Sequence, residues 1–508
     1  MQIINSIVSW LNVKRLHQIE LFKQYPFFVQ EETLLKLVNK AKETEWGIKY
    51  SYDKISSVGD FQKNVPLQGY EEIKDHVNRL REGETNILWP GEIKWFAKSS
   101  GTTSDKSKFI PVSKEALEDC HFRGGKDIMA LYTNQNPQTK VFSGKGLTLG
   151  GSHKINNFSN QSYFGDLSAI LIENLPWWVD FIRTPSVDIA LLDKWEEKIE
   201  KITEATIKEN VTHIAGVPSW NLVLIKHILN ATGKNNLLDV WPNLELFTHG
   251  GVSFAPYREQ FKKVIQSESM NYMEAYNASE GFFAIQDDPT QEGMLLMLDY
   301  GIFYEFIPME EFHNESPQAI TVDKVMPGKN YAIVISTNSG LWRYIIGDTV
   351  TFTTLFPHRI KITGRTKHFI NAFGEEIIID NAEKALQIAC EKTHSAIREY
   401  TAGPIFMDDK ANGAHEWLIE FEQEPENLDY FTSLLDNALC SINSDYEAKR
   451  YLNITLRMPV VRKMNEGCFM HWMKEKGKLG GQNKVPRLAN NRQYVDEVMG
   501  INEKMNLL

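Results

Sequence analysis

Apolar residues at helical spacing dominate the first 90 residues. Ile4, Ile7 and Leu11 fall on one side of a helix, because residues three and four apart share a face. Residues 70–80 repeat this spacing. The N-terminal region is therefore predicted to be helical.

Between residues 141 and 350 the pattern alternates between short apolar runs and amphipathic runs. The predicted strands are 141–149, 211–217 and 244–248, and the predicted helices are 195–209 and 220–229. Such alternation predicts an α/β domain whose sheet is substantially parallel, with loops at the strand ends forming the site. Three later apolar runs, 293–298, 302–307 and 331–336, are typical of antiparallel strands.

A domain boundary is predicted at residues 363–367, where Gly364 interrupts the apolar pattern. Beyond it, residues 377–388 and 427–439 have helical spacing, and residues 416–421 have the alternation of a strand. A smaller α+β domain is therefore expected at the C-terminal end.

Composition narrows the class of protein. The chain has 508 residues, a formal net charge of −11 and only four cysteines, which are widely separated. An acidic chain is unsuited to general nucleic-acid binding, although one local cationic site is enough for ATP. Isolated cysteines fit a reducing compartment, and no stretch approaches a membrane span. We expect a cytoplasmic protein with no nucleic-acid or membrane partner.

The first candidate site is a run of hydroxyl residues around one glycine. It comprises Ser99, Ser100, Gly101, Thr102 and Thr103, and Lys106 and Lys108 follow. A glycine-containing turn exposes backbone N–H groups that attract phosphate oxygens, and hydroxyls and a lysine add donors. The run is not a Walker loop, because no Gly-Lys-Ser/Thr closes it. A solvated polar linker has the same composition.

Two later segments contain carboxylates that follow an aromatic residue or an apolar run. Tyr276 precedes Glu280 by four residues, so an aromatic ring for adenine and a carboxylate for Mg²⁺ lie close in sequence. Asp348 ends an apolar run that includes Tyr344, and a carboxylate there can accept from both ribose hydroxyls. Taken singly, Glu280 is a solvated or helix-capping acid and Asp348 a turn residue.

A last candidate is Lys484, in the glycine-rich segment 480–487. Most lysines in such settings are surface charge.

In this order, the segments resemble those of the adenylate-forming superfamily of acyl-CoA synthetases, adenylation domains and luciferases. The hydroxyl run with Lys108 looks like its phosphate loop, and Gly347-Asp348 like its ribose-binding acid. The nucleotide-binding residues implied in the aromatic motif are Tyr276, Asn277, Ala278, Ser279 and Glu280. Arg365 and Lys367 resemble the hinge motif and Lys484 the C-terminal catalytic lysine. The resemblance implies catalytic roles for Glu280, Lys367 and Lys484, and nucleotide contacts for Tyr344, Arg365 and Lys367.

Within the superfamily, the chain resembles the auxin-responsive acyl-acid amido synthetases, the Gretchen Hagen family. The matching segments are Phe61-x-x-Asn64-Val65-Pro66 with residues 70–74, Gly216-Val217-Pro218-Ser219-Trp220, residues 304–308 and residues 340–344. The resemblance implies an α/β fold: a large N-terminal domain, 1–364, with sheet layers and a β-barrel-like part, and a small mobile α+β domain, 365–508.

The function implied is an ATP- and Mg²⁺-dependent ligase. It would adenylate a small carboxylic acid and pass the acyl group to an amine, plausibly an amino acid, as a monomer or weak dimer. Two alternatives stay open: coenzyme A as the acceptor, or a nonenzymatic nucleotide-binding regulator. Trp220, His249 and Phe254 are candidates for lining the acyl site, with core packing as the competing interpretation of Trp220 and Phe254.

Overall fold

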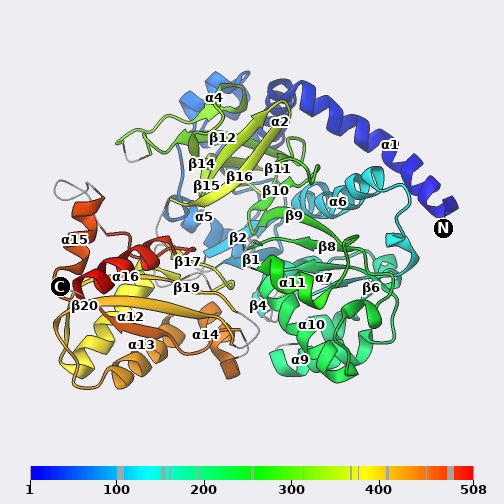
Figure 1. The fold of residues 1–508 in the computed structure, drawn as a ribbon. Coiled ribbons are helices and arrows are strands. Elements are labelled where there is room, and N and C mark those ends of the chain that lie inside the picture. Colours follow the sequence, from blue (N-terminus) through cyan, green and yellow to red (C-terminus); the bar gives the residue numbers. More distant parts are fainter. Residues whose placement is uncertain are drawn as a thin grey trace.

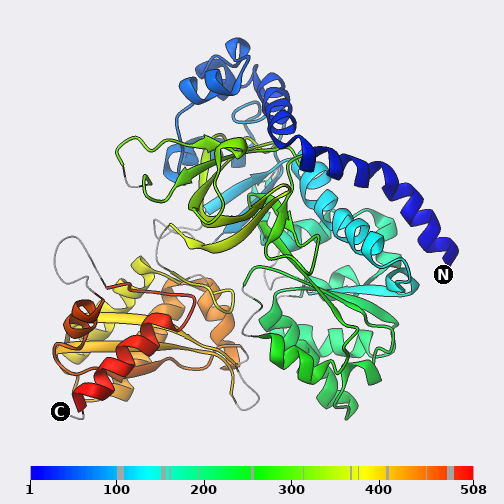
Figure 2. The same ribbon diagram turned by 45° about the horizontal axis from the view of Figure 1, so that its top comes forward.

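The structure is a computed structural model. It describes residues 2–99, 108–149, 156–159, 162–192, 194–252, 254, 257–312, 314–366, 369–375, 377–407, 411–453, 455–476 and 485–506. The chain folds into a large N-terminal part and a smaller C-terminal part, coloured yellow to red in Figure 1 and seen from a second direction in Figure 2.

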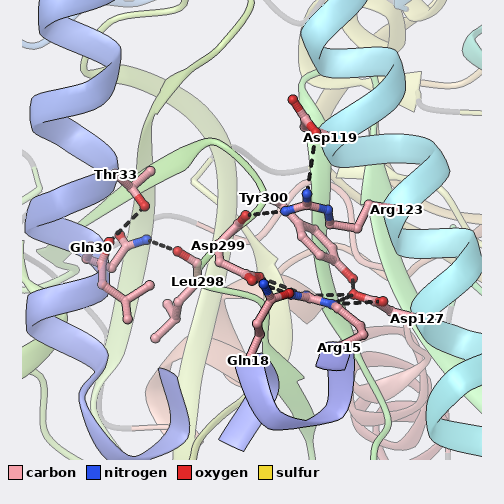
Figure 3. A network of polar contacts seen from close by, with 11 residues as sticks. Arg15, Gln18, Gln30, Thr33, Asp119, Arg123, Asp127, Leu298, Asp299 and Tyr300 are labelled. Carbon is pink, nitrogen blue, oxygen red and sulfur yellow. Dashed lines mark hydrogen bonds and ion pairs between the residues drawn. The ribbon is translucent and has the colours of Figure 1, made fainter. Parts of the chain in front are cut away.

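The N-terminal region is helical, as predicted. It contains α1 (Gln2–Gln24), α2 (Pro26–Ala41), α3 (Glu45–Lys49), α4 (Val58–Asn64) and α5 (Tyr70–Arg81). Arg15 of α1 donates hydrogen bonds to Asp127 of α6 (Phe122–Gln135) and to Asp299, and the Tyr300 hydroxyl donates to Asp127 at 2.7 Å (Figure 3). Two carboxylates and one guanidinium thus fasten α1 to the body of the protein.

The parallel half of the main sheet follows the predicted alternation. In sheet order its strands are β6 (Arg183–Thr184), β3 (Lys145–Thr148), β7 (Val211–Gly216), β8 (Leu246–His249) and β9 (Asn271–Ala278), each parallel to its neighbours. The helices of this half are α8 (Val187–Ala190), α9 (Trp195–Thr206), α10 (Pro218–Thr232) and α11 (Arg258–Val264), whereas α7 (Leu167–Glu173) packs on a second, four-stranded sheet.

The strand predicted at 141–149 is shorter than expected. Val141–Ser143 form a 3₁₀ turn, and β3 begins only at Lys145. At Gly144 the chain passes so close to Asn210 that a Cβ would lie 2.1 Å from the Asn210 carbonyl oxygen. This close backbone approach bends the chain before the ladder starts, because only glycine fits there.

The antiparallel half continues the same sheet beyond β9. Its strands in order are β10 (Gly281–Ile285), β11 (Met294–Leu296), β16 (His358–Arg365), β15 (Tyr344–Leu355), β14 (Asn330–Thr337), β12 (Ile302–Pro308) and β13 (Ile320–Thr321). The three antiparallel strands predicted between 293 and 336 are confirmed as β11, β12 and β14. A separate four-stranded sheet has the order β2 (Lys108–Val112), β1 (Trp95–Ser99), β5 (Ser162–Gly165) and β4 (Asn156–Ser159).

The C-terminal part is an α+β unit. Its strands are β17 (Phe369–Ile370), β18 (Ile377–Ile378), β19 (Ala396–Ile405), β20 (Ala414–Gln423) and β21 (Val460–Lys463), and its helices are α12 (Ile379–Thr393), α13 (Leu428–Ile442), α14 (Ser444–Arg450), α15 (Cys468–Glu475) and α16 (Gln493–Asn506). The predicted helices at 377–388 and 427–439 correspond to α12 and α13. However, residues 377 and 378 belong to β18.

The C-terminal part packs directly on the parallel half of the large part. One apolar cluster runs through both, so their cores are continuous at this contact. The Tyr257 hydroxyl donates to the Ala372 carbonyl oxygen at 2.8 Å, and its ring lies edge-on to Phe406 at 6.4 Å. The helices α10 and α11 therefore face the C-terminal unit.

Candidate active site

The core of the candidate site is a hydrogen-bonded triad on three strands. The Tyr276 hydroxyl on β9 donates to one carboxylate oxygen of Asp348 on β15 at 2.6 Å. Arg365 at the end of β16 donates through Nε to the other oxygen at 2.8 Å. Asp348 and Arg365 are direct partners in the β15–β16 register, which explains how residues 17 positions apart meet. Three sequence-predicted residues thus converge.

Asp348 keeps acceptor capacity in this arrangement. A carboxylate has about four lone-pair positions, and the two donors named above occupy one on each oxygen. The Asp348 side chain is buried. Desolvation and the neighbouring charge of Asp348 raise the pKa of Tyr276 well above its usual value. Tyr276 therefore acts here as a neutral donor that orients the carboxylate.

Glu280 lies in a tight turn beside this triad. Ser279 and Glu280 connect β9 to β10, whose end residues Ala278 and Gly281 pair directly. Desolvation raises the pKa of the partly buried Glu280 to about 7. Lys108 opposes the shift and Asp348 reinforces it. Strong perturbation by burial and named charges is typical of functional sites.

Two further predicted residues surround Glu280. Lys108, at the start of β2, is buried and its Nζ lies 5.8 Å from the centroid of the Tyr70 ring. Tyr344, at the start of β15, is fully buried, and its hydroxyl has no hydrogen-bond partner among the described residues. An orphaned buried hydroxyl within electrostatic reach of Glu280 is a donor available to a polar ligand.

The hydroxyl run is described only at its two ends. Ser99 closes β1 and is the register partner of Lys108 on β2, so both flank the connection between these strands. Ser100, Gly101, Thr102 and Thr103 lie outside the described residues, as do Lys367 and Lys484. In the aromatic motif, Asn277 is exposed, and Ala278 and Ser279 are partly buried.

His249 and Phe254 lie together near the end of β8. Their rings stack with centroids 4.1 Å apart, and both side chains are buried. Burial lowers the pKa of His249 to about 3, and its Nδ1 has no partner in the described part of the chain. Phe254 belongs to the core cluster, and Trp220 packs against it half-buried.

Several segments that carry the resemblance form a structural clasp away from the triad. Arg343 donates to both carboxylate oxygens of Glu305 at 2.9 Å and to the carbonyl oxygens of Gln62 and Val65. Phe61 lies edge-on to the Trp342 ring at 6.3 Å. These contacts fix the end of α4 on the sheet. They bring together three segments that are far apart in the sequence: 61–66, 304–308 and 340–344.

One residue that sequence reasoning missed is Lys449. It lies on α14 of the C-terminal part, yet its Nζ is 4.1 Å from the Trp220 ring centroid on α10 of the large part. Nothing in the segment 444–450 distinguishes this lysine from a surface charge, because only the packing of α14 on α10 brings it inside.

Other site classes find no support in the described residues. Across those ranges, no group of three or more His, Cys, Asp or Glu side chains is placed to hold a metal ion. None of the helices described is both long and apolar enough to cross a membrane.

Comparisons with known proteins agree with this architecture. An acyl acid amido synthetase, AtGH3.15 in complex with 2,4-DB, shares the fold with a TM-score of 0.61 at 17% identity, covering 96% of this chain and 95% of its own. A 2-hydroxyisobutyryl-CoA ligase in the thioesterification state gives a TM-score of 0.57 at 12% identity, covering 94% and 92%. The 4-substituted benzoates-glutamate ligase GH3.12 of Arabidopsis thaliana is 21% identical over 90% of this chain and 92% of its own.

The fold is thus that of acyl-activating synthetases with a large and a small domain. The chain matches the GH3 family N-terminal domain over residues 15–270, the central domain over 295–365 and the C-terminal domain over 380–493. It belongs to the GH3 family.

Proposed function

We propose that this protein is an ATP-dependent acyl-acid amido synthetase. It adenylates a small carboxylic acid and transfers the acyl group to an amine of the amino acid class, by analogy with the GH3.12 ligase. The observation that carries the proposal is the convergence of Tyr276, Asp348 and Arg365 beside Glu280 and Lys108.

In the first half-reaction, the substrate carboxylate attacks the α-phosphorus of ATP and pyrophosphate leaves. This displacement needs positioning and charge neutralisation rather than covalent help from the protein. Asp348, held by Tyr276 and Arg365, accepts hydrogen bonds from the ribose hydroxyls. Lys108 and the hydroxyls of Ser99, Ser100, Thr102 and Thr103 bind phosphate oxygens.

Glu280 fits a single carboxylate ligand for Mg²⁺. Magnesium in nucleotide sites is commonly held by one or two carboxylates together with phosphate oxygens, and a partly buried acid beside the phosphate-binding residues suits that role. Bound there, the ion would neutralise charge on the phosphates.

In the second half-reaction, the amine nitrogen attacks the acyl carbonyl carbon. The bond to the phosphate oxygen breaks, AMP leaves with the bonding pair, and the amine loses a proton to give the amide. We propose that the small domain, 365–508, rotates about the segment around Arg365 and Lys367 between the two half-reactions. Cytoplasmic action as a monomer or weak dimer belongs to the same proposal.

Coenzyme A is the competing acceptor. The observation in its favour is the fold shared with the 2-hydroxyisobutyryl-CoA ligase. A nonenzymatic regulator is disfavoured, because Glu280, Asp348, Lys367 and Lys484 all occur in one chain.

The test is pyrophosphate–ATP exchange over a panel of carboxylic acids, starting with benzoates and indole-3-acetate. Any acid that supports exchange is then incubated with ATP and either an amino-acid mixture or coenzyme A, and products are identified by mass spectrometry. Amide formation supports the proposal, and a thioester without amide moves the assignment to a CoA ligase. Absence of ATP binding by calorimetry at millimolar ATP with Mg²⁺ rejects both.

A further inference from the structure

A lysine of the small domain is buried against the large domain. Lys449 is 7% exposed, and its ammonium lies over the Trp220 ring in the first turn of α10. Gly374, with φ of +92°, makes room for it: a Cβ there would lie 3.3 Å from Lys449 Cε and 3.7 Å from the Trp220 ring. The side chain is therefore held between both domains.

This ammonium has no counter-ion among the residues described. Burial lowers the pKa of Lys449, and the charges of Asp445, Asp166 and Glu375 oppose that shift, but none of the three forms an ion pair or hydrogen bond with it in those ranges. Glu375 is committed elsewhere, since it accepts from the backbone N–H groups of Ala372 and Phe373 and bonds to His415. A buried charge without a partner is costly, so the position favours an anionic ligand.

One helix end near Lys449 adds positive potential to that of the ammonium. The helix α10 has 15 residues, and its N-terminus carries partial positive charge from aligned peptide dipoles. It follows β7, whose last residue Gly216 pairs with His249 of β8, and His249 pairs with Glu274 of β9. Lys449 thus stands at the same edge of the sheet as Tyr276, two residues beyond Glu274.

We propose that Lys449 binds the carboxylate of the acceptor amino acid in the amide-forming half-reaction. This rests on the function proposed above and adds the residue that holds the acceptor. In an α-amino acid only one carbon separates the amine from the carboxylate, so an anchored carboxylate restricts where the nitrogen can attack. Lys449 contacts the substrate without exchanging atoms with it: the nitrogen–carbon bond forms, AMP leaves, and the carboxylate is unchanged.

The site also discriminates between acceptors. A simple amine has no carboxylate for Lys449 and gains nothing from it. The phosphates of coenzyme A are a second possible ligand for the Lys449 ammonium. The experiment below distinguishes them from the carboxylate of an amino acid. Domain closure in the orientation described here completes the site, because Trp220 and Lys449 come from different domains.

The test measures amide formation with glycine and with methylamine, which differ by the carboxylate, using an acid shown to support exchange. In Lys449→Met, which keeps an unbranched apolar stem over Trp220, the KM for glycine should rise about 10- to 100-fold, the scale of a charge-assisted hydrogen bond. The KM for methylamine should change less than about twofold. Lys449→Arg should retain the preference for glycine. Lys474→Met, which removes an exposed lysine of the same domain, is the matched control.

Lys449→Gln is measured in parallel, so that the result does not depend on how one variant folds. Equal rises of both KM values, or no change in either, overturn the proposal. Loss of thioester formation with coenzyme A at unchanged KM for glycine would assign the anion to coenzyme A phosphates and also overturn it. Failure of the wild-type protein to support exchange with any acid rejects the proposed function instead, before any variant is compared.

Discussion

At the scale of single residues, Asp348 links the sequence to the chemistry. Its two carboxylate oxygens are each oriented by one donor, from Tyr276 and from Arg365. This orientation leaves lone pairs on Asp348 that can accept hydrogen bonds from a ribose. The negative charge of Asp348 also neutralises the guanidinium of Arg365.

Asp348→Asn should weaken ATP binding by about 1.5–3 kcal/mol, the usual scale of a hydrogen bond to a charged group. The amide keeps the shape of the side chain but replaces one acceptor oxygen with a donor. Isothermal calorimetry on the folded variant measures the loss. Tyr276→Phe, which removes one orienting donor, should cost about 0.5–1.5 kcal/mol. Unchanged ATP affinity in Asp348→Asn would leave Asp348 with a structural role only, as the partner of Tyr276 and Arg365.

Buried histidines predict how stability depends on pH. Burial lowers the pKa of His121 to about 4, below the value of 6.5 for an exposed histidine. Between these values the unfolded chain binds a proton that the folded chain does not, so the free energy of unfolding falls as pH falls from about 6.5 to 4.

His121→Phe should reduce this dependence by up to about 1.4 kcal/mol per pH unit, the contribution of one proton. Urea unfolding at intervals from pH 4.5 to 7 compares the variant with the wild type. Parallel curves for the two proteins would show that His121 is protonated equally in both states.

The residues of the triad could be predicted from sequence, whereas Lys449 could not. Tyr276 and Asp348 occur in recognisable motifs, and Arg365 follows a glycine at the predicted boundary. Lys449 acquires its environment from Trp220 and Gly374, which are 229 and 75 positions away in the chain. Contacts of this kind come from domain packing, which local periodicity does not encode.

At the scale of elements, the clasp around Arg343 joins a helix to two strands. Arg343, just before β15, is paired with Glu305 on β12, and both side chains are buried. Arg343 also satisfies the carbonyl oxygens at the end of α4.

Arg343→Met should lower the free energy of unfolding by about 3–5 kcal/mol, because it leaves the Glu305 charge buried without its partner. The double variant Arg343→Met/Glu305→Leu should recover much of that loss, since a buried ion pair can often be replaced by apolar packing. Urea denaturation measures both. Lys361→Met, in an exposed pair with Glu292, should change stability by less than about 1 kcal/mol. A similarly small effect at Arg343 would contradict the clasp.

Element types were predictable where apolar periodicity is strong, and element ends were not. The strands β7, β11, β12 and β14 match their predicted runs closely. The start of β3 moved to Lys145 because Gly144 meets the backbone of Asn210, a tertiary contact. The hairpin of β15 and β16, which brings Asp348 to Arg365, was not predicted as strands, although Val350 and Phe352 alternate with threonines, as a strand requires.

At the scale of the whole molecule, the two domains meet through one defined face. Ala372 and Lys449 of the C-terminal part contact Tyr257 and Trp220 of the large part. Val485 packs instead in the cluster formed by α15 and α16 (Figure 1). Ala372 and Val485 thus lie in different clusters, and the proposed rotation of the small domain would exchange the faces that they mark.

Lys484 is the residue through which this alternation can be tested. A lysine has the charge and reach to stabilise the phosphates as negative charge shifts to pyrophosphate. Lys484→Ala is expected to slow pyrophosphate exchange by on the order of a hundredfold, as loss of one preorganised charge-stabilising group does. Amide formation from supplied acyl-adenylate should suffer much less, because the domain has then turned another face to the site. Lys449→Met should instead impair amide formation more than pyrophosphate exchange. Equal losses of both half-reactions in Lys484→Ala would refute alternation, and no loss in either would leave Lys484 as surface charge.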